Sequence, residues 1–297
     1  MSVKDEVLKQ LENNKGKYFS GSDLATALGV SRNAVWKAIK SLEKSGYKIS
    51  AVPNRGYRLD TENDILSSWS IRQHLKHSEL KLTVYESISS TNTVLKELAE
   101  QGAKHGTVII SQEQTAGKGR MGKKFYSPSK TGIYLSILVR PDIPAQEALF
   151  LTTSAAVATA RAIEDVSDKK ADIKWVNDIY ICDKKVDRKI LTEAAFNIET
   201  GKLDYAVIGI GINICYPEEG FPEEINEISA AVFEHDSDTT NKRSLLIANL
   251  LDYFMDYYDN FDKKSYVNEY IKRSMLIDRN ILIINGDTST PAIAKEI

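Results

Sequence analysis

The sequence is poor in cysteine, has no long hydrophobic run and carries almost no net charge. Its two cysteines, Cys182 and Cys215, are too few for a disulfide framework and lack the partners of a zinc site. No apolar run reaches the roughly 18 residues of a membrane span, and the N-terminus has no hydrophobic signal region. A formal charge of -2 excludes a polycation that coats nucleic acid or membranes. These absences favour a cytoplasmic protein in which any anion binding is local.

What the chain does contain is typical of a soluble globular protein. Its 297 residues are 42% hydrophobic and 27% charged, which is enough to build a packed core. At roughly 100 to 200 residues per domain, the length predicts about two domains and leaves room for a small third piece.

Positive charge is concentrated at the front of the chain. Residues 1–60 hold 11 Lys/Arg against 6 Asp/Glu, a net of +5, and the remainder carries -7. Apolar spacing predicts three helices there, over residues 3–12, 24–28 and 32–44. Ser22 or Asp23 is expected to cap the second helix and Ser31 the third. A short hairpin turning at Pro53-Asn54-Arg55-Gly56 follows.

This order of elements predicts a winged helix-turn-helix. The third helix buries one apolar stripe and leaves a basic face free, which suits the major groove of DNA. A three-helix bundle whose basic face is merely solvated is the alternative, and the ordered caps, turn and arginine-tipped hairpin argue against it. The candidate DNA-binding residues are Ser22, Ser31, Arg32, Asn33, Trp36, Lys37, Lys40 and Arg55.

The rest of the chain predicts an α+β domain. A polar, helical linker is expected over residues 61–78. Strand patterns occur at residues 81–86, 107–112, 132–139, 173–175, 178–182, 190–196 and 205–214, and helical patterns at 91–101, 146–167 and 243–260. Because strands and helices do not alternate steadily, a mixed sheet is favoured over a doubly wound parallel one.

The densest chemical motif is a basic glycine-rich loop after the second of these strands, spanning residues 112–124. It formally matches GxGxxG and nearly matches a Walker A loop, but position 124 is lysine and a strand rather than a helix follows. A flexible loop whose backbone approaches a ligand while its cations neutralise phosphate or carboxylate explains it better. The alternative is a solvated basic hairpin that binds no ligand.

Three smaller motifs accompany this loop. Ser90-Thr91-Asn92 lies between a strand and a helix, where it caps the helix or offers polar groups to a ligand. Lys174-Trp175-Val176-Asn177-Asp178 places a polar pair at a turn. Gly209-Ile210-Gly211-Ile212-Asn213 is a strand with two small residues, which predicts either close backbone packing or the floor of a pocket.

Taken in order, these motifs resemble the bifunctional biotin-protein ligase and biotin-operon repressor family over nearly the whole chain. The resemblance implies a winged-helix DNA-binding domain at 1–62, a class II synthetase-like catalytic domain at 63–276 and a truncated SH3-like barrel at 277–297. It implies that biotin and Mg²⁺-ATP form biotinyl-5'-AMP, and that biotin then passes to a lysine of biotin carboxyl carrier protein. An adenylate-bound homodimer would repress biotin genes by spanning two operator half-sites.

The resemblance also assigns roles to residues. Lys185 and Arg120 would be catalytic. The implied biotin-binding residues are Ser90, Thr91, Asn92, Gln114, Lys118, Gly119, Arg120 and Lys185. The implied ATP- or adenylate-binding residues are Gly117, Lys123, Trp175, Asn177, Asp178 and Asn213.

The chain departs from the family pattern at three places. After Lys185, residues 186–189 are one residue longer than expected, lack glycine and add three charges, so the following strand would reverse its faces unless a bulge absorbs the extra residue. Lys118 stands where arginine is common. Only about two strands of the C-terminal barrel are present. A DNA-binding biotin sensor impaired in ligation is therefore the alternative function, and a lipoate ligase relative is a third, disfavoured by the winged helix.

Overall fold

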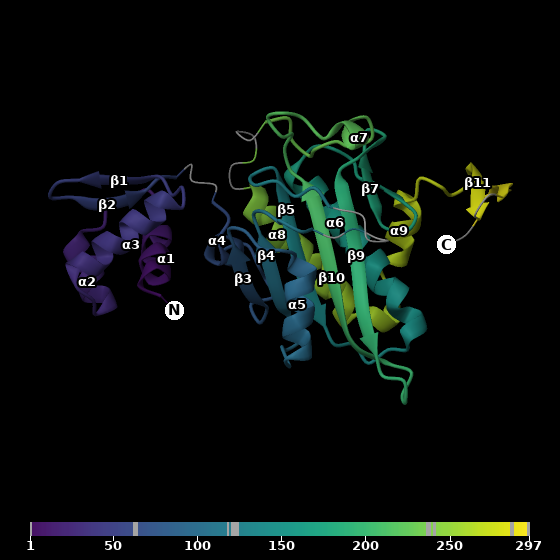
Figure 1. Ribbon diagram of the computed structural model, residues 1–297, viewed down its shortest axis with the longest axis horizontal. Helices are drawn as coiled ribbons and strands as arrows, with labels where there is room; N and C mark the ends of the chain where they lie inside the picture. Colours follow the sequence, from purple (N-terminus) through teal and green to yellow (C-terminus); the bar gives the residue numbers. More distant parts are fainter. Residues whose placement is uncertain are drawn as a thin grey trace. The chain divides into compact units, whose positions relative to one another are not determined.

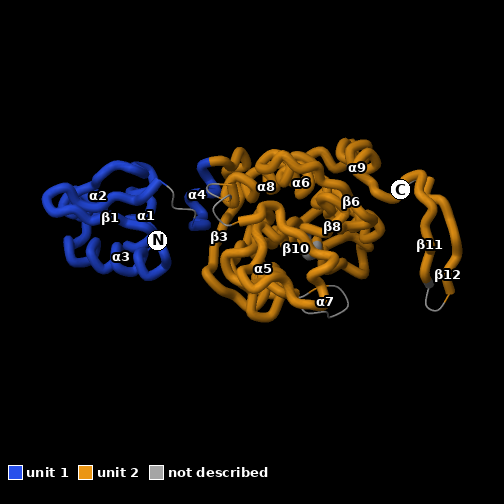
Figure 2. Tube along the Cα trace, turned by 90° about the horizontal axis from the view of Figure 1, so that it is seen from above, with its two compact units in different colours: residues 1–73 blue, residues 74–297 orange. Residues whose placement is uncertain are grey.

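The computed structural model describes residues 2–61, 65–117, 119, 125–235, 239, 242–285 and 288–295, with the backbone alone at 187–189, 262 and 285. The chain forms two compact units, residues 1–73 and 74–297 (Figure 2). Among the described residues, no helix combines the length and hydrophobicity that crossing a bilayer requires.

The first unit is the predicted winged helix-turn-helix. Its elements are α1 (Val3–Asn13), α2 (Gly21–Leu28), α3 (Arg32–Lys44), the hairpin β1 (Ile49–Val52) and β2 (Gly56–Leu59), and the short α4 (Ser68–Arg72). Val35, Ile39 and Leu42 lie fully buried on one stripe of α3, in a core shared with α1 and α2. The opposite stripe of α3 is exposed, as the apolar spacing predicts.

Two details of this unit differ from the sequence-based expectation. The cap of α2 is Ser20, whose hydroxyl accepts a hydrogen bond from the Asp23 backbone N–H at 3.0 Å, so the prediction of Ser22 or Asp23 as the cap was wrong. The helix starts earlier because Ser20 already has the extended backbone of a cap. Ser31 caps α3 as predicted. Of the expected linker helix, only α4 is helical among the described residues.

Glu12 on α1 is a buried carboxyl in this unit. It is 7% exposed, and it accepts a hydrogen bond from the Ser67 hydroxyl, just before α4, at 3.4 Å. Burial raises the pKa of Glu12 from its ordinary value of 4.5 to about 7, while the charge of Lys15 and the Ser67 hydrogen bond oppose that shift. The carboxyl therefore keeps its proton in the folded unit at pH values at which the unfolded chain releases it.

This pKa predicts that the first unit is destabilised as pH rises. Stability is full below pH 4.5 and is lost as pH increases toward 7, because only the unfolded chain ionises in that window. Glu12→Gln should remove the loss and stabilise the unit at pH 8 by on the order of 3 kcal/mol. Amide hydrogen exchange of α1 in the full chain measures this. Glu6→Gln on the same helix is the control for charge, and an unchanged pH dependence in Glu12→Gln would contradict the prediction.

The second unit is built on a five-stranded mixed sheet. The order is β3 (Lys81–Tyr85), β4 (Thr107–Ser111), β5 (Gly132–Val139), β10 (Leu203–Asn213) and β9 (Asp187–Phe196), and only the β3–β4 pair is parallel. A smaller antiparallel sheet holds β6 (Asp172–Lys174), β7 (Asp178–Ile181) and β8 (Lys184–Lys185). This arrangement confirms the predicted α+β class.

Helices cover both faces of the five-stranded sheet. α5 (Thr91–Glu100) packs on one face, and α6 (Ala148–Val166), backed by α8 (Lys242–Asp259), lies on the other (Figure 1). Two short helices, α7 (Glu223–Asn226) and α9 (Val267–Arg273), had no prediction from the sequence. A C-terminal hairpin, β11 (Asn280–Asn285) with β12 (Thr288–Ile293), forms the small antiparallel sheet at the end of the chain.

Strand β10, which lies between β5 and β9, shows how the sheet faces are divided. Tyr205 and Val207 pack against Leu95 and Ala99 of α5. Alternation along a strand then places Gly209 and Gly211 on the same face, nearer the end of β10. Because Gly209 and Gly211 have no side chains on the face that α5 covers, they leave room above this part of the sheet.

A bulge in β9 absorbs the extra residue that follows Lys185. Gly211 is paired with Lys189 but the next residue, Ile212, is paired with Asp187, so Arg188 has no partner in the ladder. Downstream of the bulge, Leu191 faces Gly209 directly across the strand pair. Because the bulge absorbs the extra residue, the side chains downstream of it do not reverse their faces.

Candidate functional site

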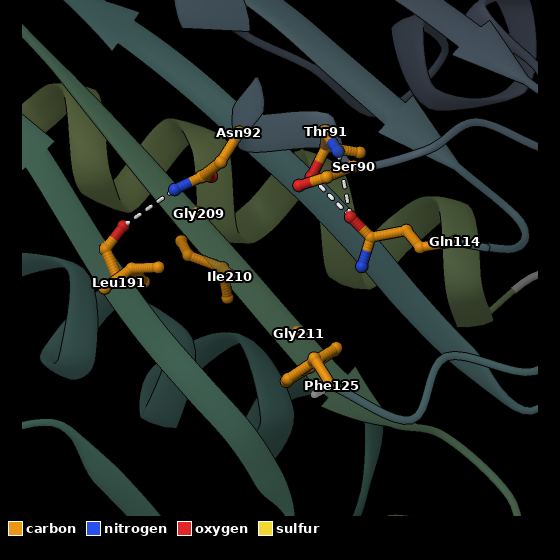
Figure 3. Close-up of a pocket in the computed structure, with 9 residues that line it drawn as sticks. All are labelled: Ser90, Thr91, Asn92, Gln114, Phe125, Leu191, Gly209, Ile210 and Gly211. Atoms are coloured by element: carbon orange, nitrogen blue, oxygen red, sulfur yellow. Dashed lines mark hydrogen bonds between the residues drawn. The ribbon is translucent and has the colours of Figure 1, made fainter. Parts of the chain in front are cut away.

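A pocket opens above the two glycines of β10, between the sheet and the start of α5 (Figure 3). The empty space in and above it amounts to about 310 Å³, open solvent included. Its lining residues come from five separate segments of the chain: Ser90, Thr91, Asn92, Gln114, Phe125, Leu191, Gly209, Ile210 and Gly211. The sequence-predicted residues Ser90, Thr91, Asn92 and Gln114 are thus brought together.

A side chain at either floor position would displace a neighbouring side chain. A Cβ on Gly209 would overlap the Oδ1 atom of Asn92, and a Cβ on Gly211 would overlap the ring of Phe125. The sequence left two alternatives open for this strand, close packing and a pocket floor, and both are correct. Asn92 and Phe125 can lie on the backbone of β10 only because no side chains intervene.

The first turn of α5 forms the polar wall. Ser90 caps the helix, and Thr91 and Asn92, both about 5% exposed or less, follow it directly. The side-chain oxygen Oε1 of Gln114 accepts from the Thr91 backbone N–H at 2.9 Å and from the Thr91 hydroxyl at 3.1 Å. The Gln114 amide then donates to the Ser127 hydroxyl at 3.1 Å. These hydrogen bonds fix the orientation of Gln114.

The glycine-rich loop leaves the pocket from a narrow stem. The Phe125 N–H donates to the Gly117 carbonyl at 2.9 Å, which brings the two ends of the loop together. A Cβ on Gly117 would approach the Phe125 carbonyl to 2.8 Å, so the stem is too tight for a side chain there. Gly119 is half-buried, whereas the predicted residues Lys118, Arg120 and Lys123 lie outside the described residues.

Lys185 lies at the end of the β7–β8 hairpin and forms an ion pair with Asp178. Both side chains are mostly buried, at 18% and 28% exposure. The Lys185 backbone N–H donates to the Ile228 carbonyl, and the Lys185 carbonyl accepts from the Ala230 N–H. The Ala230 carbonyl accepts from the Asn213 side-chain amide at 3.0 Å. Lys185 does not line the pocket itself. Its ion pair holds Asp178 beside it, and the shared hydrogen bonds to Ala230 hold Asn213 nearby.

Asn177 and Trp175 differ in their surroundings. The Asn177 amide is buried and donates to the carbonyl of Ile190, directly before the pocket residue Leu191. The Trp175 ring is 45% exposed and stands edge-on to Tyr270 at 6.2 Å between ring centroids. The Asn177 amide is therefore held beside the pocket, and the Trp175 ring has an exposed face.

Three residues at the pocket were not predicted from the sequence: Phe125, Leu191 and the buried Ser136 behind it. The Ser136 hydroxyl lies 2.6 Å from Asn92 Oδ1 and 2.8 Å from the Thr91 hydroxyl. A signal for it existed, because Ser136 is a polar residue within the otherwise apolar 132–139 strand, and buried polar groups require partners.

In the first unit, the predicted DNA-binding residues lie along α3 and the hairpin. Arg32, Asn33, Trp36, Lys37 and Lys40 are all exposed on one side of α3. A groove between α3 and the hairpin is lined by Arg32, Asn33 and Trp36 of α3, by residues 51–54, 56 and 57 of the hairpin, and by Ser22 at the start of α2. Ser31 and Arg55 are exposed as well, and the Arg55 guanidinium lies over the Tyr18 ring.

Comparison with family models and known proteins covers both units. Residues 84–213 match the biotin/lipoate A/B protein ligase family, and residues 4–58 match a helix-turn-helix domain. The chain is 36% identical over 260 residues to the bifunctional ligase/repressor BirA of Bacillus spizizenii, covering 87% of this chain and 79% of that protein. It is 28% identical to BirA of Escherichia coli, covering 95% and 86%.

Solved structures support the fold of the second unit. The biotin protein ligase from Aquifex aeolicus in complex with biotin and ATP aligns with a TM-score of 0.57 at 23% identity. The alignment covers 72% of this chain and 86% of that one.

The overlap at Gly209 gives a testable coupling. Gly209→Ala should destabilise the second unit by about 1–3 kcal/mol, because the new methyl group displaces the Asn92 amide. In an Asn92→Ala background the same change should cost about 1 kcal/mol or less, since the obstacle is gone. Urea unfolding of the four proteins of this cycle measures the coupling, and strictly additive effects would contradict the packing described.

Proposed function

The chain belongs to the family of bifunctional biotin protein ligases and repressors, and from that premise we propose that it both activates and transfers biotin and represses biotin genes. The ligase forms biotinyl-5'-AMP from biotin and ATP and passes biotin to a lysine of biotin carboxyl carrier protein. The observation that carries the proposal is the glycine-floored polar pocket, in which Ser90, Thr91, Asn92 and Gln114 converge.

The pocket suits the ureido ring of biotin. A planar cyclic urea has two N–H donors and one carbonyl acceptor, and the wall offers hydroxyl and amide groups that match both kinds. The bare backbone at Gly209 and Gly211 lets a flat ring lie close to β10. The stem of the glycine-rich loop borders the pocket through Phe125, so Lys118, Gly119 and Arg120 are proposed to close over the bound ligand.

The first chemical step joins two anions. The biotin carboxylate attacks the α-phosphorus of ATP, pyrophosphate leaves, and a mixed anhydride forms. Positioning and fixed positive charge lower the barrier of such a reaction. Lys185 is the proposed central cation, assisted by Arg120. Its ion pair with Asp178 supports this role, because the partner holds the ammonium in place before substrates arrive.

In the second step, the amine of the carrier lysine attacks the biotinyl carbonyl and AMP leaves. The adenylate would be held by Gly117, Lys123, Trp175, Asn177, Asp178 and Asn213. Among the described residues no group of three or more His, Cys, Asp or Glu side chains is placed to cage a metal ion. Mg²⁺ usually keeps several waters and binds through one or two carboxylates plus substrate phosphates, so Asp178 fits a Mg²⁺ that arrives with ATP.

The repressor activity rests on the first unit. Its exposed α3 face would enter the major groove, and the hairpin would add phosphate contacts. A winged helix reads one half-site, so a palindromic operator implies a homodimer, which we place in the adenylate-bound state. Biotin supply would then set occupancy of the operator.

A ligation-impaired biotin sensor is the second candidate, and the charged 187–189 segment beside the pocket favours it. The bulge in β9 weakens that argument, because Leu191 still lines the pocket. Labelling of the carrier protein separates the two functions: a ligase transfers biotin to the carrier lysine, and a sensor retains the adenylate or biotin without transfer.

Lys185→Ala should abolish adenylate formation while leaving the fold intact. The measurement is mass spectrometry of protein-bound biotinyl-AMP after incubation with biotin and Mg²⁺-ATP and desalting. Loss of the fixed cation should lower the rate by roughly a hundredfold or more, as removal of transition-state charge stabilisation does elsewhere. Lys184→Ala, the exposed neighbour on β8, is the matched control. Adenylate at wild-type levels in Lys185→Ala would contradict the assigned role.

Lys37→Ala should weaken binding to specific and mixed-sequence DNA alike. Loss of one phosphate contact reduces the dependence of log affinity on log salt concentration by about one unit. Fluorescence anisotropy over a salt series, with biotin and ATP present, measures the slope. Lys9→Ala removes the same charge from an exposed position on α1. Equal slopes for the two variants would count against α3 as the DNA-binding face.

A further inference from the structure

Asn92 is connected to a pair of charged residues outside the pocket. Its amide nitrogen donates to Glu193 Oε2 at 2.9 Å and to the Leu191 carbonyl at 3.3 Å. The other carboxylate oxygen of Glu193 accepts from Lys96 Nζ at 2.8 Å. Lys96 lies four residues after Asn92 on α5, so both side chains face β9 from the same side of the helix. Glu193 thus bridges Lys96 and the pocket.

The Glu193 carboxylate determines which end of the Asn92 amide faces the pocket cluster. If the amide were reversed, its oxygen would face Glu193 Oε2 and the Leu191 carbonyl, and three acceptors would meet without a proton. In the observed orientation the nitrogen faces these two acceptors and Oδ1 faces Ser136. The hydrogen bond from Lys96 keeps the carboxylate in place, and the same bond raises the pKa of Lys96.

This orientation leaves the wall of the pocket short of protons. Three close oxygen pairs link the cluster: Ser136 with Asn92 at 2.6 Å, Ser136 with Thr91 at 2.8 Å, and Thr91 with Gln114 at 3.1 Å. Only the two hydroxyl groups supply protons to these pairs, because Asn92 and Gln114 both present amide oxygens there. With more acceptor sites than protons, the Thr91–Asn92 wall offers lone pairs to a ligand.

We infer that Lys96 and Glu193 are positioning residues that hold Asn92 as an acceptor and thereby select ligands that donate N–H groups to this wall. The inference rests on the proposed function, in which the ligand is biotin and the donors are its ureido N–H groups. Neither residue lines the pocket, so both act through Asn92.

The pair can be tested by reversing the Asn92 amide on purpose. In Glu193→Gln, Lys96 still requires an oxygen, so the glutamine places Oε1 toward Lys96 and its NH₂ group toward Asn92. Asn92 then gives up its hydrogen bond to the Leu191 carbonyl and turns its own oxygen toward that NH₂ group and its nitrogen toward Ser136, which gives the wall a donor in place of an acceptor. Adding Lys96→Met lets the glutamine rotate and restores the original orientation.

The measurement is the affinity of each protein, by calorimetry, for biotin and for a carbonate analogue in which oxygen replaces both ureido N–H groups. The wild-type chain should prefer biotin, and Glu193→Gln should reduce this preference by roughly tenfold, the amount expected when one neutral hydrogen bond to the ligand is lost. Lys96→Met combined with Glu193→Gln should recover most of the preference. Glu199→Gln, in the exposed turn after β9, controls for the charge and should leave the preference unchanged.

A merely structural role would weaken both ligands equally and leave the preference unchanged, and that result in Glu193→Gln would overturn the inference. Failure of the double variant to recover the preference would overturn the part assigned to Lys96. Failure of the wild-type chain to bind biotin at all would instead overturn the proposed function, together with this inference.

Discussion

The close approach of α5 to the backbone of β10 is the contact on which the rest of the pocket depends. Asn92 lies where a side chain of residue 209 would otherwise stand, and Phe125 lies where one of residue 211 would stand. Because these positions are glycine, the first turn of a helix can rest on the middle of a sheet. The pocket is the space that remains beside this contact.

Polar groups buried by this approach are satisfied mainly by one another. Thr91, Asn92, Gln114, Ser127 and Ser136 form a continuous set of hydrogen bonds, which extends outward to Lys96 through Glu193. Removing one partner from such a network lowers stability, because a buried polar group without a partner has lost its hydration and gains no hydrogen bond in exchange. The same cost gives the site its rigidity, since each amide has one favourable orientation.

The Lys185–Asp178 pair is positioned by a separate part of the fold, the small β6–β7–β8 sheet. Chemistry that joins two anions needs a fixed cation near a binding pocket but not inside the space that the ligand occupies. In the proposed reaction, the hydrogen bonds between Lys185, Ala230 and Asn213 would supply that arrangement. The bulge at Arg188 is what lets β9 carry its longer entry segment while Leu191 still faces the pocket.

Local sequence signals determined the elements and most of the polar wall. Apolar spacing predicted α1, α3, α5 and the strands of the main sheet, because burial of one stripe or face imposes that spacing. Motifs predicted Ser90 to Asn92, Gln114 and the Gly209 to Gly211 floor. The tertiary structure alone decided that Phe125, Leu191 and Ser136 join them and that Glu193 orients Asn92. These facts depend on contacts between segments that are distant in sequence, and no local pattern records which side chain will meet which across a sheet.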